Sequence, residues 1–123
     1  MPEGNMSGKD YNFVFACSGA ADVGAIADQA ARLIRCEGAA AMCCTVAISA
    51  GIPDILDKAR GAKKTVVFDG CSLNCAKTIL EKADLDGFTH IMLEDLGMPK
   101  GKTPPTDERV RSVADTGLRA LGA

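Results

Sequence analysis

The sequence predicts an α/β fold, namely a single-domain three-layer α/β/α sandwich with a four-stranded parallel sheet in the order 2-1-3-4. Short apolar segments alternate four times with longer segments whose apolar residues recur at helical spacing. The short segments are continuous apolar runs rather than alternations, which is typical of strands buried on both faces. Right-handed crossovers between parallel strands then restrict the strand order.

The first half of the chain contains two of these units. Residues 12–17, "NFVFAC", combine aromatic and β-branched side chains and predict the first strand. Residues 18–35 predict a helix that Gly38 ends. The apolar run 39–48 is ambiguous between strand and helix; we interpret it as a strand that ends near Cys44, followed by a turn of small residues. Residues 52–60 predict a helix with Pro53 in its first turn.

The second half repeats the pattern more clearly. Residues 64–70, "KTVVFDG", predict a strand, and residues 72–84 predict a helix with one apolar face. Residues 89–96 predict the fourth strand, and a loop rich in glycine and proline follows it. The last helix covers residues 106–122, with Thr106 as its N-cap and two acidic residues in its first turn.

Length and composition limit the class of protein. The 123 residues fit one domain at 11–123, preceded by a flexible polar lead at 1–10. A net charge of −2 without any basic block argues against nucleic-acid binding. No segment approaches the roughly 20 apolar residues that span a membrane, and no targeting signal is visible. We therefore expect a cytoplasmic protein with reduced thiols, for which a homo-oligomer is compatible with the sequence.

Four cysteines follow the predicted strands. Cys17 ends the first strand, Cys44 ends the second, and Cys71 and Cys75 come directly after the third. Because parallel strands share one carboxyl edge, the topology carries these four thiols to one region. Four thiolates suit a zinc ion or, as a second choice, an iron–sulfur cluster. Helix N-termini next to Cys71 and Cys17 favour the thiolate form that a metal requires.

Other interpretations of the same cysteines stay open. Cys71 or Cys17 could be the activated thiolate of a redox or nucleophilic enzyme, with another cysteine resolving it. All of them could instead be small buried residues of the core. Only one of Cys43 and Cys44 should face the site, because adjacent strand residues face opposite ways. Cys36 is expected outside the site, and His90, the single histidine, is interpreted as structural.

The residues that carry these features also resemble a known family. The segments "FACSGAADVGAIADQAA", "MCCTVAIS", "VVFDGCSLNCAKTILEKA" and "LEDLGMPKGK" are similar to the DGC-domain family, small zinc-binding proteins named after an Asp-Gly-Cys motif. That motif is Asp69, Gly70 and Cys71 here. The resemblance implies Cys17, Cys44, Cys71 and Cys75 as metal ligands and supplies no reaction. One departure is Cys43, at a position that is often aromatic in the family, where a further thiol could compete as a ligand.

Overall fold

The computed structural model describes residues 11–122, so the predicted lead at 1–10 lies outside the described residues. Four parallel strands form one sheet in the order β2-β1-β3-β4, which confirms the predicted fold class and strand order. The elements in chain order are β1 (Phe13–Ala16), α1 (Asp22–Cys36), β2 (Ala41–Met42), α2 (Thr45–Ser49), α3 (Pro53–Arg60), β3 (Thr65–Asp69), α4 (Cys75–Lys82), β4 (Thr89–Met92), the 3-10 helix η3 (Leu93–Leu96) and α5 (Asp107–Leu121).

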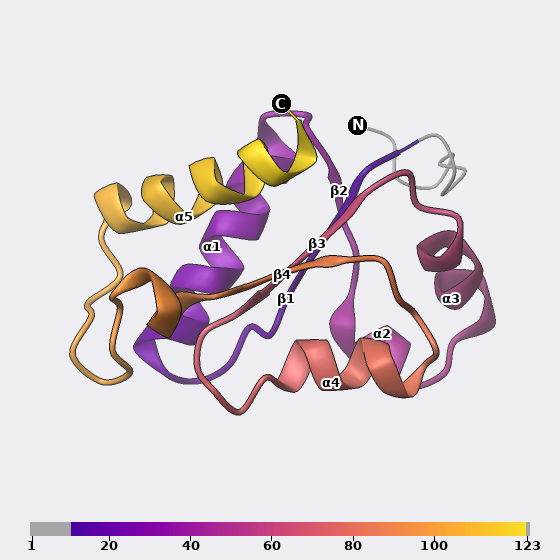
Figure 1. Cartoon of the computed structure of the whole chain (residues 1–123), viewed down its shortest axis with the longest axis horizontal. Coiled ribbons are helices and arrows are strands. Elements are labelled where there is room, and N and C mark those ends of the chain that lie inside the picture. Colours follow the sequence, from indigo (N-terminus) through magenta and orange to yellow (C-terminus); the bar gives the residue numbers. More distant parts are fainter. Residues whose placement is uncertain (1–10, 123) are drawn as a thin grey trace.

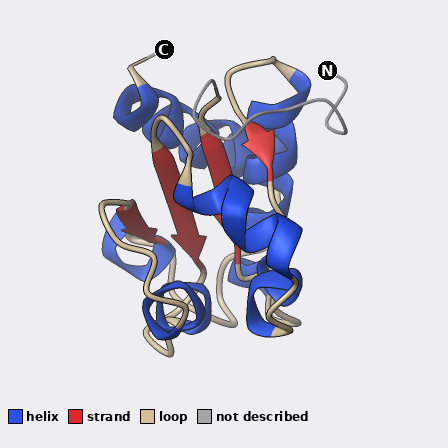
Figure 2. Cartoon of the chain, turned by 90° about the vertical axis from the view of Figure 1, so that its right-hand side faces the viewer, coloured by secondary structure: helices blue, strands red, loops and turns tan. Residues whose placement is uncertain are grey.

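The helices form a layer on each face of the sheet. Figures 1 and 2 show α1 and α5 together on one face and α2, α3 and α4 on the other. Strand β1 illustrates why both faces are apolar: Val14 packs into the core under α1 and α5, whereas Phe13 and Phe15 pack into the core on the opposite side. Every residue of β1 is buried, which explains the continuous apolar run in the sequence.

Close packing of α5 depends on a missing side chain. A methyl group at Gly117 would lie 2.6 Å from Phe68 Cζ and 2.9 Å from Ile34 Cδ1, closer than carbon atoms can approach. Gly117 therefore allows α5 to pack on both α1 and β3. Thr106 caps this helix as predicted, since its side chain accepts a hydrogen bond from Arg109 N.

Several element boundaries differ from the sequence prediction, among them the start of α1, which lies at Asp22 rather than at residue 18. Strand β2 ends at Met42 rather than near Cys44, and the short helix α2 replaces the expected turn of small residues. Helix α4 begins at Cys75, three residues later than predicted. Strand β4 ends at Met92, where η3 begins. The local pattern of apolar residues does not indicate where these helices and strands begin or end, because hydrogen bonds between distant residues determine those positions. Within the described residues, no helix is both long enough and apolar enough to cross a membrane.

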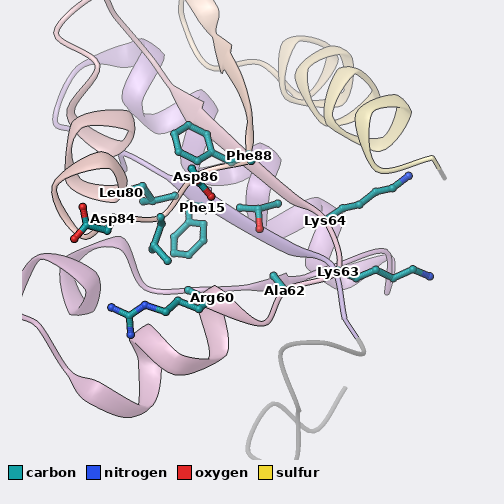
Figure 3. A pocket seen from close by; sticks show the side chains of 13 residues that line it. Phe15, Arg60, Ala62, Lys63, Lys64, Leu80, Asp84, Asp86 and Phe88 are labelled. Carbon is teal, nitrogen blue, oxygen red and sulfur yellow. The ribbon is translucent and has the colours of Figure 1, made fainter.

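A small cavity lies at the amino edge of the sheet. It has a volume of about 130 Å³, and its lining includes Phe15, Leu80 and Phe88. The side chains of Lys63 and Lys64 extend away from these residues (Figure 3). No cysteine lines this cavity, so the thiol chemistry belongs to the opposite edge.

Candidate thiol and metal site

The carboxyl edge of the sheet carries the four cysteines that the sequence singled out. Cys17 directly follows β1, and its backbone N–H donates to Phe68 O of the neighbouring strand at 3.0 Å. Cys44 is the N-cap residue of α2, two positions after β2 ends. Cys71 lies two residues after β3, and Cys75 is the first residue of α4. The topology therefore places all four residues on one side of the molecule.

Two adjoining cavities divide these thiols. The first, of about 340 Å³, is lined by Cys17, Cys71 and Cys75. The second, of about 500 Å³, is lined by Cys17, Cys43 and Cys44. Cys17 belongs to both linings and so connects the two groups. Cys36 lines neither of them and is exposed at the end of α1, as the sequence suggested.

The thiols differ in their access to solvent. Cys17 and Cys71 are half-buried, whereas Cys44 and Cys75 are exposed. Across residues 11–122, no three side chains of His, Cys, Asp or Glu lie close enough together to hold one metal ion. Sulfur donors fit zinc, but the cysteine sulfurs lie too far apart in this structure for tetrahedral coordination of one ion. The metal-ligand set Cys17, Cys44, Cys71 and Cys75 stays a prediction.

Glycines fix the first cavity by allowing backbone-to-backbone contact. A Cβ atom at Gly70 would lie 2.7 Å from Val23 C, and one at Gly24 would lie 2.5 Å from Gly19 O. Neither position has room for a larger residue without a shift of main chain. The Asp-Gly-Cys segment and the loop after Cys17 therefore both rest directly on the start of α1.

Asp69 ties the end of β3 to the start of α4. Its buried side chain accepts hydrogen bonds from Ala76 N at 2.8 Å and Lys77 N at 3.0 Å. Both donors belong to the first turn of α4, so Asp69 orders the start of that helix. His90 Nε2 lies 2.9 Å from Asp69 Oδ2. This bond gives His90 a structural contact, in line with its interpretation from the sequence.

Cys71 is not at a helix terminus, which corrects part of the argument from sequence. Residues between Cys71 and Cys75 form a turn, with Asn74 N donating to Cys71 O at 3.1 Å. Asn74 has a left-handed backbone with φ of 52°. It is Cys75 that occupies the helix start. The helix dipole therefore acts on Cys75 more directly than on Cys71.

Sequence reasoning missed Lys100, whose Nζ lies 3.8 Å from Cys71 Sγ. The loop that carries Lys100 is held by Asp22, which accepts hydrogen bonds from Gly101 N at 2.8 Å and Thr103 N at 2.9 Å. The bond from Gly101, followed by that from Thr103, holds the pKa of Asp22 below its usual value. The available signal was the segment "LEDLGMPKGK", which contributed to the family resemblance without a role for its lysine.

The second cavity contains charged groups of both signs. Asp28 accepts hydrogen bonds from Ser18 Oγ and from Arg32 Nε, each at 2.7 Å. Burial opposes ionisation of Asp28, but these two bonds outweigh it and its pKa lies below the usual value. Arg35 also lines this cavity. The region around Cys44 is therefore more polar than the region around Cys71.

Comparison with known proteins places the chain in a family. The DGC domain profile matches residues 13–116, which include all four cysteines. The chain belongs to the DGC-domain family. It is similar to the "Anaerobic and virulence modulator AnvM" of Pseudomonas aeruginosa, with 33% identity over 88 residues. That match covers 71% of this chain and 66% of the relative, slightly less than two thirds of its length. No solved structure matches the chain.

Proposed function

We propose that this DGC-domain protein binds a zinc ion through Cys17, Cys44, Cys71 and Cys75. The observation that carries the proposal is the arrangement of these thiols in two adjoining cavities that share Cys17. Thiolate is the preferred donor for zinc in such sites, and a zinc ion held by all four sulfurs would stabilise this edge of the sheet with no coordination position left for a substrate. An iron–sulfur cluster on the same ligands is the second choice.

The residues of the chain would prepare the site in two ways. Asp69 and Gly70 hold the segment from Cys71 to Cys75 against α4 and α1. Each thiol must lose its proton before it can bind a metal, so the affinity should fall as the pH is lowered. No three of these sulfurs lie close enough to share an ion among the described residues, so one ion bound by all four would require both Cys44 and the thiols of the first cavity to move closer together.

Metal analysis of native protein tests the proposal. Untagged protein purified anaerobically and without chelator is expected to contain zinc. Cys71→Ser should lower the zinc stoichiometry sharply and leave the far-ultraviolet circular dichroism close to that of the wild type. Cys36→Ser is the matched control and should change neither quantity, because Cys36 lies outside both cavities. Wild-type protein without any metal would refute the zinc proposal, and brown, iron-containing protein would replace zinc by a cluster.

A thiol-based reaction is the alternative, and the contact between Lys100 and Cys71 favours it. The Lys100 ammonium group lies 3.8 Å from Cys71 Sγ, where it can pair with an anion formed or bound at this sulfur. Cys17 is the second candidate nucleophile, since it lines the same cavity. The name of the relative, a modulator, is compatible with either a metal-dependent or a thiol-dependent regulatory role. Metal-free native protein with one thiol of unusually low pKa would support this alternative.

A further inference from the structure

The cavity lined by Cys17, Cys71 and Cys75 has a size suited to a small molecule. Its volume of about 340 Å³ falls within the range of roughly 300–1,000 Å³ that ligand pockets occupy. Apart from the thiols, much of the lining is small or apolar and comes from Ala20, Ala21, Val23 and Leu73. Leu73 is 70% exposed at the rim. Such a surface suits the hydrocarbon part of a ligand.

Lys100 adds a positive charge to this apolar lining. It is the one residue of the lining with a cationic side chain, and it is exposed. Asp22 fixes the backbone next to Lys100 through Gly101 N, so the position of the lysine is set by the fold rather than by its own side chain. The carboxylate of Asp69 also belongs to the lining, but both of its oxygens already accept hydrogen bonds from α4.

Asn74 also belongs to the lining, but its Oδ1 is buried from solvent and can only accept hydrogen bonds, so it adds nothing to the binding of an anion. The charge of Lys100 is therefore the feature that distinguishes this lining.

We propose that the cavity binds a small organic carboxylate and that Lys100 selects it by its negative charge. The inference rests on the proposed thiol site being open to ligands, and it names the ligand class of that site. The carboxylate pairs with Lys100 Nζ, the hydrocarbon part contacts the apolar lining, and the ligand reaches Cys71 Sγ. It requires no metal, so it can be tested on metal-free protein.

Competing alkylation with two matched reagents tests the selection by charge. Iodoacetate and iodoacetamide have nearly equal size, and both form an S–CH₂ bond to the thiolate sulfur as iodide leaves. They differ in charge. The measured quantity is the rate with iodoacetate divided by the rate with iodoacetamide at Cys71, obtained by tandem mass spectrometry of the peptide 65–77. Because both reagents attack the thiolate, this ratio does not depend on the fraction of Cys71 that is ionised. Lys100→Met should lower this ratio roughly fivefold at low ionic strength, as expected for a partly exposed ion pair.

Control variants distinguish the effect of the Lys100 charge on the alkylation ratio from the effect of any positive charge in the same loop. Lys102→Met removes an exposed lysine from the same loop and should leave the ratio at Cys71 unchanged. Lys100→Arg keeps the charge and should keep most of the preference for iodoacetate. Cys36, outside the cavity, serves as the internal reference and should show the same ratio in every variant.

Two outcomes would overturn the inference: a ratio at Cys71 that Lys100→Met leaves unchanged, or an equal decrease in Lys102→Met. Zinc content is measured separately on the same variants, and Lys100→Met should retain zinc. Wild-type protein without zinc would refute the zinc proposal and leave the alkylation result unaffected. An alkylation ratio that Lys100→Met leaves unchanged would refute the carboxylate inference and leave the zinc proposal unaffected. The two proposals can therefore fail independently.

Discussion

Replacing Asp69 by alanine should destabilise the protein strongly, because this one side chain holds three groups. Its oxygens accept from Ala76 N at 2.8 Å and Lys77 N at 3.0 Å, and His90 Nε2 lies 2.9 Å away. Asp69 is 1% exposed, so water cannot replace the carboxylate freely. The alanine variant leaves the start of α4 without its acceptor.

The magnitude follows from these contacts. Hydrogen bonds to a charged group contribute about 1.5–3 kcal/mol each, and an unsatisfied buried donor costs about 1–3 kcal/mol. Some of this loss is offset, because the variant no longer buries a carboxylate and because Lys77 N and His90 are only partly buried. We expect the free energy of unfolding to fall by about 3 kcal/mol. Asp69→Asn should lose about half as much, since its amide oxygen still accepts from Ala76 N.

Urea unfolding at pH 7, followed by circular dichroism, measures the change. Asp57→Ala is the matched control, because the Asp57 side chain is 77% exposed and its contact with Arg60 lies on the surface. It should change the free energy of unfolding by less than about 0.5 kcal/mol. If Asp69→Ala and Asp57→Ala differ by less than about 1 kcal/mol, the argument that Asp69 anchors α4 is refuted.

Two further predictions concern packing and pH. Gly117→Ala should lower the free energy of unfolding by about 1–3 kcal/mol, because the added methyl group clashes with Phe68 and Ile34. Ser112→Ala, on the exposed face of α5, is the control and should not lower it. Equal thermal stability of the two variants would contradict the packing argument. The folded state lowers the pKa of Asp22, so its contribution to stability is present above the unfolded value of 3.8 and is lost as the pH falls through the folded value. Wild type should therefore be more stable than Asp22→Asn at pH 7, and thermal unfolding should show this difference shrink below pH 3.8; a constant difference would count against it.

Most of the fold could be predicted because it depends on local patterns. The apolar run of β3 and the helical spacing in α1 and α5 are visible in the sequence, and crossover handedness then restricts the strand order. The run 39–48 was misjudged because its composition suits strand and helix equally. Helix α2 forms where Thr45 Oγ1 donates to Ala16 O at 2.8 Å, a contact across 29 residues. Such a partner is invisible to any local pattern.

The candidate site could be predicted only as far as the edge of the sheet. Parallel topology is enough to bring Cys17, Cys44, Cys71 and Cys75 to that edge. The separation of their sulfurs depends on loop conformations, such as the left-handed Ser18 and Asn74, which the sequence does not specify. Lys100 was missed for the same reason, because it meets Cys71 from 29 residues away.

Hydrogen bonds hold both halves of the site to the sheet. The segment from Cys71 to Cys75 is fixed by the backbone contact of Gly70 with α1, by Asp69, and by Ser72 N donating to Glu94 Oε1 at 2.8 Å. Cys44 is exposed, but the residues on both sides of it are anchored to β1, since Cys43 N donates to Val14 O at 2.9 Å and Thr45 Oγ1 donates to Ala16 O at 2.8 Å. A ligand that joined the two cavities would therefore be reached by rotation of the cysteine side chains rather than by displacement of either backbone segment.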